Sequence, residues 1–357
     1  MKVSIGAYIK EGPWGGGNLF FINLKNYLEN KGYKVINHLL DDDIDIILLS
    51  DPRKDSESSS FTHNEIIKYR ENINSQVKVV HRINECDERK ETEGLNKFIY
   101  NANKCSDATI FVSNWLKDLY FNQGYKTINS QVIMSGSNSE IFNSNNGKKW
   151  DGNEKISLVT HHWGGNWNKG FDIYSKIDLM MADTKYSNYY EFSYIGNIPS
   201  DFTFKNTNFI EPLSGISLAN ELKKNHIYIT ASRNEPSGNH HIEAALCGLP
   251  ILYINSGAIP EYSKDFGLEF NLDNFEEKLF EIKDKYYDLK NNLDNYPYKA
   301  SEMNKQYEDL FLKLVSSNDL KKTQITNSGY AKKLFFSSKR IIILYLYNIF
   351  KKNKLWK

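Results

Sequence analysis

Two glutamates lie eight positions apart in a stretch that could bind a polar ligand at two points. Glu235 belongs to the polar segment 234–238, and Glu243 belongs to the short helical pattern that follows it. A carboxylate in the loop can face the outer end of a bound ligand, whereas one inside the helix can face a deeper part of it. Two solvated glutamates in an ordinary α/β unit would show the same spacing, so the surrounding elements must decide between these interpretations.

Residues 226–254 predict a strand, a loop, a helix and a second strand. Alternating β-forming residues come first, the polar loop 234–238 interrupts them, and a helical run and a short apolar run follow. In parallel α/β sheets, ligands bind beside the carboxyl ends of the strands, where a helix N-terminus offers free N–H groups and partial positive charge. Gly238, Asn239 and His240 begin this helix, so we expect them to contact an anionic part of the ligand.

A glycine run near the start of the chain predicts a second place of close approach. Residues 3–9 form a strand pattern, Gly15, Gly16 and Gly17 follow, and Asn18 can begin a helix with one apolar face. Consecutive glycines before a helix let the backbone approach an anion or a sugar closely. The alternative is that the run is a flexible connector.

These features resemble the E-x7-E region of retaining glycosyltransferases with the GT-B fold, especially family 4 (group 1). The resemblance covers most of residues 1–315 and is more specific in the second half of the chain. The matching residues are Ala231, Ser232, Glu235, Ser237, Gly238, Glu243, Ala244, Ala245, Gly248 and Pro250.

The resemblance implies an α/β protein of the GT-B fold, in which two Rossmann-like domains face each other across a cleft. It further implies a glycosyltransferase that moves a sugar from a nucleotide-sugar donor to a glycan or lipid-linked acceptor. Retention of configuration and a place in surface polysaccharide or glycoconjugate synthesis are also implied. The nucleotide sugar is a substrate, and no metal or other cofactor is expected.

The resemblance also implies roles for individual residues. Glu235 would contact the donor sugar, Glu243 would hold the ribose, and Lys169 would bind the diphosphate. His81, after the strand predicted over 77–80, would lie near the transferred sugar; a hydrogen-bonded structural histidine is the alternative. The expected catalytic residues are therefore Glu235, Lys169 and His81. The expected donor-binding residues are Gly15, Gly16, Gly17, Lys169, Arg233, Gly238, Asn239, His240 and Glu243.

One position departs from the family pattern. Family members have an arginine several residues before the lysine, and the two cations bind the donor diphosphate together. Residues 161–168 contain no arginine. His161, His162, Asn166 and the more distant Arg233 are candidates to replace it, and the sequence does not decide among them.

This departure keeps two other functions open. A non-catalytic GT-B subunit could bind a nucleotide sugar and activate a partner, and a nucleotide-sugar epimerase or hydrolase could use the same fold. A metal enzyme is disfavoured, because the acidic run 41–43 is typical of a solvated turn. The histidine pairs 161–162 and 240–241 lack a chelating spacing, since neighbours on a strand point to opposite faces and neighbours on a helix point about 100° apart.

The length of 357 residues suits two domains. We expect an acceptor domain over 1–150, a donor domain over 151–316 whose last helix crosses back to the first, and a tail over 317–357. Three widely spaced cysteines indicate a reducing compartment. Residues 1–9 predict a strand and no signal peptide, so the expected location is the cytoplasm. Apart from the tail, acidic residues outnumber basic ones, which disfavours nucleic acid as a partner.

The tail predicts contact with a membrane surface. From Lys332 to Lys357 it carries basic residues and no acidic ones, and it brackets the apolar run 341–350 with cations. That run is too short to span a bilayer but suits the headgroup layer, where each basic residue adds about 1 kcal/mol near anionic lipid. A helix packed on the protein body is the alternative.

We therefore expect the full chain to float with anionic liposomes in a density gradient, and a chain that ends at Gly329 to stay at the bottom. Equal flotation of the two chains would contradict the membrane prediction and would leave the prediction of a glycosyltransferase untouched.

Overall fold

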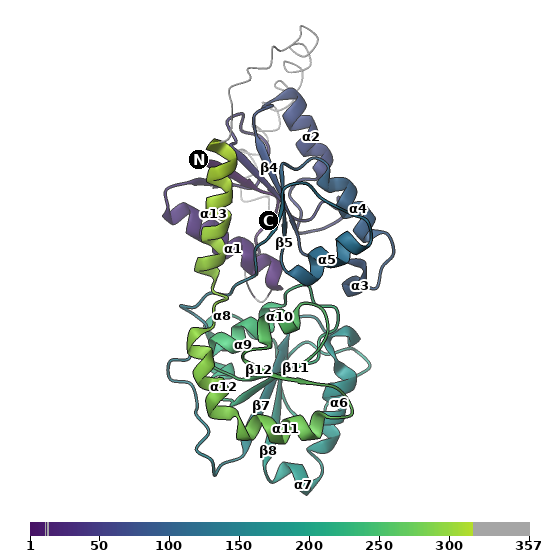
Figure 1. Ribbon diagram of the computed structural model, residues 1–357, viewed down its shortest axis with the longest axis vertical. Coiled ribbons are helices and arrows are strands. Elements are labelled where there is room, and N and C mark those ends of the chain that lie inside the picture. Colours follow the sequence, from purple (N-terminus) through teal and green to yellow (C-terminus); the bar gives the residue numbers. More distant parts are fainter. Residues whose placement is uncertain (11, 13, 317–357) are drawn as a thin grey trace, which may run out of the picture.

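The computed structural model describes residues 1–316 except 11 and 13, and it forms two α/β domains stacked along the long axis of the molecule (Figure 1). The last strand of the first sheet ends at Val132 and the first strand of the second begins at Ile156, so the boundary predicted near residue 150 falls between them. The predicted membrane-contacting tail, residues 317–357, lies outside the described residues.

The sheet of the first domain is parallel throughout its described strands, and its order is β2-β1-β3-β4-β5-β6. The strand order reverses at β1, since β2 lies on one side of it and β3 to β6 follow on the other. Its strands are short and rich in Val and Ile, as expected for a sheet covered by helices on both faces. They are β1 (Lys2–Ile5), β2 (Lys34–Ile36), β3 (Ile46–Leu49), β4 (Lys78–Ile83), β5 (Ala108–Phe111) and β6 (Ser130–Val132).

The sheet of the second domain is also parallel and has the order β9-β8-β7-β10-β11-β12. This is the strand order of a Rossmann fold, with its reversal between β7 and β10. The predicted architecture of two Rossmann-like α/β domains is therefore confirmed. The strands are β7 (Ile156–His162), β8 (Tyr190–Gly196), β9 (Asn208–Ile210), β10 (Ile227–Thr230), β11 (Ile251–Ile254) and β12 (Gly267–Phe270).

Helices connect the strands and cover both sheets (Figure 1). Those of the first domain are α1 (Gly16–Asn30), α2 (His63–Asn72), α3 (Asp87–Lys90), α4 (Leu95–Asn103) and α5 (Asn114–Asn122). Those that follow β7 are α6 (Phe171–Met180), α7 (Thr184–Ser187), α8 (Gly215–Leu222), α9 (Asn239–Leu246), α10 (Ile259–Ser263), α11 (Phe275–Asp284), α12 (Tyr286–Asn292) and α13 (Ala300–Ser316), with short 3₁₀ turns η1 (Trp167–Lys169) and η2 (Leu293–Asn295).

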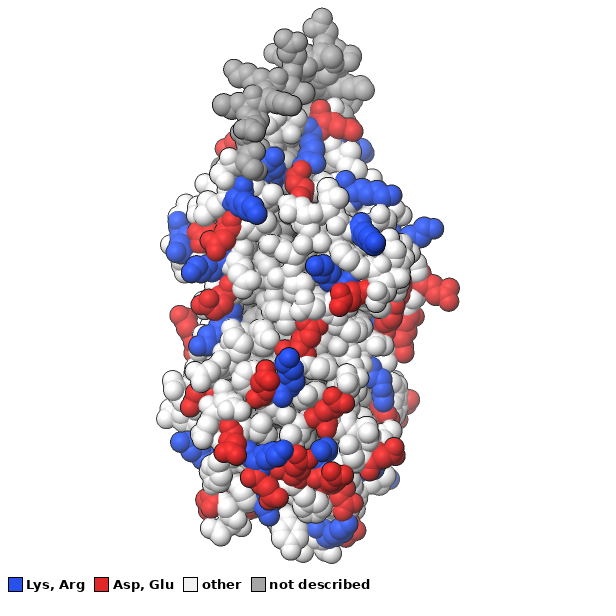
Figure 2. All heavy atoms as spheres, viewed as in Figure 1, with Lys and Arg blue, Asp and Glu red and all other residues white. Residues whose placement is uncertain are grey.

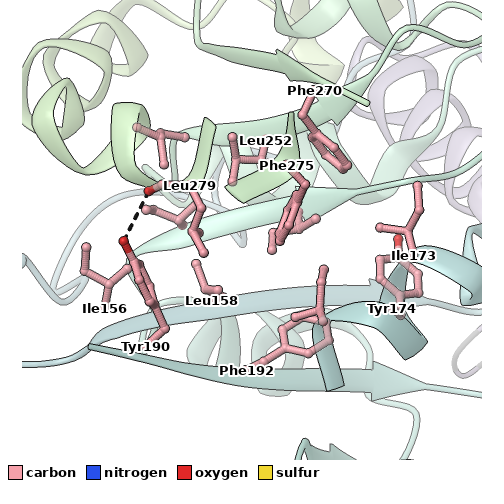
Figure 3. Packing of buried hydrophobic residues seen from close by; sticks show 14 of the residues in the cluster. Ile156, Leu158, Ile173, Tyr174, Tyr190, Phe192, Leu252, Phe270, Phe275 and Leu279 are labelled. Atoms are coloured by element: carbon pink, nitrogen blue, oxygen red, sulfur yellow. Dashed lines mark hydrogen bonds between the residues drawn. The ribbon is translucent and has the colours of Figure 1, made fainter. Parts of the chain in front are cut away.

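A core rich in aromatic residues covers one face of the second sheet (Figure 3). Ile156 and Leu158 alternate on β7, and Tyr190 and Phe192 alternate on β8, so that all four point to the same side. The Tyr190 hydroxyl donates to the carbonyl of Leu279 at 3.3 Å, which satisfies a polar group inside the core. This packing fixes β7 and β8 and therefore the loops at their carboxyl ends.

Helix α13 returns to the first domain and packs beside α1 (Figure 1). Its Tyr307 and Phe311 are buried in the same cluster as Phe20 and Leu24 of α1. Full burial of such a side chain contributes about 1.5–3 kcal/mol. The end of the described chain therefore stabilises the first domain and joins it to the second.

Helix α10 of the second domain makes polar contacts with the first. The hydroxyl of the fully buried Tyr262 donates to the carbonyl of Val112 at 2.8 Å and accepts from the N–H of Ser135 at 2.9 Å. The carboxylate of the preceding Glu261 accepts from the backbone N–H of Asn114, where α5 begins, and a negative charge at a helix N-terminus is favourable. These bonds hold the two domains in one orientation.

We expect Tyr262→Phe to lower the free energy of unfolding by about 2–4 kcal/mol, because it leaves a buried N–H and a buried carbonyl without their partner. Chemical denaturation measures this change. Tyr189→Phe, at a position that is 58% exposed, is the matched control and should change the value by less than about 0.5 kcal/mol. Equal stability of the two variants would contradict the role of the hydroxyl.

Candidate active site

A cavity of about 690 Å³ lies between the two domains. Its walls come from the loops after β1, β3 and β4 of the first domain and from the loops after β7, β9 and β10 of the second. These loops stand at the carboxyl ends of parallel strands, beside the points where the strand order reverses. Doubly wound sheets bind their ligands at such points.

Strand order explains why Lys169 and Glu235 meet. β7 and β10 are neighbours in the sheet, so the loops that follow them lie side by side. Gly170, at a φ of +94°, lets these loops pack closely, because a Cβ atom there would lie 2.4 Å from the carbonyl oxygen of Ala231. The Lys169 ammonium consequently donates to Glu235 Oε2 at 2.9 Å.

Glu235 Oε2 is surrounded by donors. Besides Lys169, the hydroxyl of Ser232 donates to it at 2.9 Å, and Arg89 Nε of the first domain lies 3.5 Å away. Behind it, Gly257 packs so tightly that a Cβ atom would lie 2.3 Å from the Glu235 nitrogen. The carboxylate is therefore held in one place by both domains.

The charges of this pair support each other. Burial alone would raise the pKa of Glu235, but Lys169 and Arg89 outweigh it and hold that pKa well below its ordinary value. Burial lowers the pKa of Lys169, while the Glu235 carboxylate opposes that shift. Glu235 is thus ionised at neutral pH, although only 9% of the residue is exposed to solvent.

Glu243 lies on α9, where it also lines the cavity and is almost fully buried. Its Oε2 is 3.0 Å from His161 Nε2, and its Oε1 accepts from the hydroxyl of Ser137 at 3.3 Å. Ser137 belongs to the segment that joins the domains. A carboxylate has more acceptor sites than these two contacts use, so Glu243 can also accept from ligand hydroxyls.

Three other histidines are buried near Lys169 and Glu235. His162 Nε2 lies 2.7 Å from the Tyr174 hydroxyl, His240 Nε2 lies 2.8 Å from the Thr230 hydroxyl, and the rings of His240 and His241 are 4.8 Å apart. Burial lowers the pKa of His162 and of His240 well below the ordinary value, and it lowers that of His241 to about 3. All three are neutral at pH 7.

The predicted glycine loop reaches the second domain at the mouth of the cavity. A Cβ atom on Gly15 would lie 3.6 Å from the Trp163 side chain, and one on Gly16 would lie 3.0 Å from Asn239. Gly17 lines the cavity, and a Cβ atom there would meet nothing within 4 Å. Gly238 also lines it, directly before α9, with a φ of +71°. The structure therefore brings the predicted glycines, Asn239 and His240 to one cleft.

Two predicted positions are wrong. β4 continues to Ile83, so His81 lies inside the strand and not at its carboxyl end. Its side chain is fully buried, with Nδ1 3.1 Å from the amide of Asn103, and it does not line the cavity. Arg233 does not line it either, because its guanidinium pairs with Asp172 outside the cleft.

Arg89 is a cleft residue that the sequence interpretation missed. It belongs to the polar segment after β4, whose carboxyl end faces the second domain. The available signal was its place in the polar segment after the strand predicted over 77–80, nine residues beyond the predicted end. No pattern within the first domain shows that this segment meets Glu235, which lies in the other domain.

No protein-family model and no curated protein sequence matches the chain. Solved structures do resemble it at low sequence identity. Sucrose-phosphate synthase from Thermosynechococcus elongatus has a TM-score of 0.60 at 13% identity over 89% of this chain and 99% of that one. HepE from Anabaena, in complex with UDP-glucose, has a TM-score of 0.64 at 12% identity over 87% and 99%. The catalytic domain of starch synthase IV from Arabidopsis thaliana, bound to ADP and acarbose, has a TM-score of 0.57 at 12% identity over 85% and 79%.

These likenesses show the fold. The chain has the GT-B fold, as the resemblance of its motifs implied.

Among residues 1–316 as described, no group of three or more His, Cys, Asp or Glu residues could hold a metal ion, and no described helix is long and apolar enough to cross a bilayer. On the face shown in Figure 2, basic and acidic side chains are interspersed.

We expect the free energy of unfolding to fall as the pH drops from 7 to 5.5. The pKa values of His81, His162, His240 and His241 are lowered in the folded state, so these groups take up protons on unfolding once the pH is below about 6.5. The contribution of these histidines to the free energy of unfolding is therefore fully present above that pH. It is lost below it, by about 1 kcal/mol per histidine over this interval.

Urea denaturation at a series of pH values measures this slope. His81→Asn should reduce the slope by about one proton, because it removes one buried neutral histidine outside the cleft. A free energy of unfolding that stays constant between pH 7 and 5.5 would show that these histidines are not held neutral.

Proposed function

We propose that the chain is a glycosyltransferase that moves a sugar from a nucleotide-sugar donor to a hydroxyl group of a glycan or lipid-linked acceptor. The observation that carries the proposal is the pair of buried carboxylate contacts, Lys169–Glu235 and His161–Glu243, in a cleft between two Rossmann-like domains. HepE with UDP-glucose and starch synthase IV with ADP, which share the fold, support a nucleotide-sugar donor.

The donor in this proposal lies along the carboxyl ends of β7 and β10. Glu243, deep in the wall, accepts hydrogen bonds from the ribose, and Glu235 accepts from the sugar. Between them, the N-terminus of α9 at Gly238 and Asn239 offers N–H groups to the diphosphate. The ammonium of Lys169 lies on the same side and supplies positive charge.

The proposed reaction replaces one bond to the anomeric carbon by another. The bond from that carbon to the diphosphate oxygen breaks, and the acceptor oxygen attacks from the same face, so that configuration is retained. The acceptor proton passes to the departing diphosphate, on which negative charge develops. Lys169 and the helix N-terminus stabilise that charge in a site shielded from water, which is where such donors are most effective.

The acceptor in this proposal binds against the first domain, whose loops form the other wall of the cavity. Surface polysaccharide or glycoconjugate synthesis in the cytoplasm, at the inner face of the membrane, is the proposed setting. The basic and apolar composition of the tail supports a lipid-linked acceptor.

Release of nucleoside diphosphate from a panel of nucleotide sugars, with and without acceptor glycans, tests the proposal. We expect Lys169→Ala to lower turnover roughly a hundredfold or more, by analogy with the loss of one donor to a developing negative charge. Glu243→Ala should chiefly weaken donor binding, and Glu235→Ala should chiefly lower turnover. Activity is expected to persist in EDTA.

Several results would contradict this account. Unchanged kinetics in both glutamate variants, with the fold intact by circular dichroism, would remove the roles of the two carboxylates. Loss of activity in EDTA and rescue by a divalent ion would refute a metal-free reaction. Hydrolysis or epimerisation of the donor without transfer, or binding without any turnover, would favour the two alternatives that share the fold.

A further inference from the structure

Arg89 is the cation that the first domain places beside Glu235. It lies in α3, soon after β4 ends, and its Nε is 3.5 Å from Glu235 Oε2. Only 14% of its side chain is exposed. A second contact joins the same two segments, since the side-chain amide of Asn234 donates to the carbonyl of Glu88 at 3.1 Å.

The other arginines near the cleft have different neighbours. These are Arg53, which pairs with Asp51 through two hydrogen bonds, Arg233, which pairs with Asp172, and Arg82, whose guanidinium lies 4.0 Å from the ring centre of Phe20. Among the described residues, Arg89 is therefore the guanidinium that can act together with Lys169.

The charges around Glu235 do not balance. Two cations, Lys169 and Arg89, share one carboxylate, and the neighbouring histidines are neutral. Glu85 also lies near them, but its carboxylate pairs with the Lys90 ammonium at 3.3 Å, so this second pair leaves the excess of positive charge unchanged. A buried excess of positive charge is costly unless an anion is bound, so the site is suited to accept one.

We infer that Arg89 and Lys169 together bind the diphosphate of the donor, and that donor binding moves both cations from Glu235 to phosphate oxygens. The inference rests on the proposed function and extends it. In the structure, Glu235 Oε2 is the anionic oxygen that both cations face. The exchange frees the Glu235 carboxylate to accept hydrogen bonds from the sugar.

This assignment explains the missing arginine of the loop 161–168. The second cation comes from the opposite wall of the cleft, so the diphosphate site is complete only when both domains contribute to it. A planar guanidinium suits a diphosphate, because it can donate two parallel hydrogen bonds to phosphate oxygens. The donor then links the two domains through its own charge.

Isothermal titration calorimetry with UDP, ADP and GDP, each compared with UMP, AMP and GMP, tests the inference. For the base that binds the wild type, we expect a clear preference for the diphosphate over the monophosphate. Arg89→Gln should reduce that preference roughly tenfold to a hundredfold, the range for lost hydrogen bonds to a charged group. Arg89→Lys, which keeps the positive charge but cannot donate two parallel hydrogen bonds, should recover part of the preference.

Arg233→Gln is the matched control, because it removes an arginine outside the cavity, and its preference should equal that of the wild type. An unchanged preference in Arg89→Gln, with donor turnover still present, would overturn the role of Arg89 and leave the proposed function intact. Failure of the wild type to bind any of the six nucleotides would overturn both. An equal loss in Arg233→Gln would show that the effect is not specific to the cleft.

Discussion

The buried ion pair between Lys169 and Glu235 is the interaction on which the rest of this site depends. Removing two charges from water costs several kcal/mol per ion unless geometry and further hydrogen bonds compensate. The protein meets that condition through strand order, which sets the two loops side by side, and through glycines at 170 and 257, which let them pack closely. Ser232 and Arg89 then satisfy the same carboxylate oxygen.

Lys169 and Arg89 together carry one more charge than the single Glu235 carboxylate that they share. Three histidines lie close to these cations, and burial holds them neutral, so they add no imidazolium charge to the site. The fold maintains the opposite wall at a fixed distance, because α13 packs on α1 and Tyr262 bonds to the first domain. A cleft built in this way can bind an anion between two rigid walls.

Sequence patterns predicted the parts of this structure that are local. The strand-loop-helix units around Glu235 and the glycine run follow from hydrophobic period and turn residues, and both reach the cleft. The predicted position of His81 was wrong because β4 runs three residues beyond the predicted end, so that His81 lies within the strand. The predicted position of Arg233 was wrong because its guanidinium donates to the carboxylate of Asp172. Arg89 could not be assigned to the site, since its position depends on how two domains dock.

Thermal unfolding in the presence of sugar conjugates of UDP, GDP and ADP tests the central claim most directly, because a ligand that binds the folded cleft stabilises it by mass action. At a concentration a hundredfold above its dissociation constant, a true donor should add about 2.7 kcal/mol and raise the Tm by roughly 4 °C. The account predicts that one nucleotide family produces this shift and that the free sugars do not. A Tm unchanged by every nucleotide sugar would contradict it.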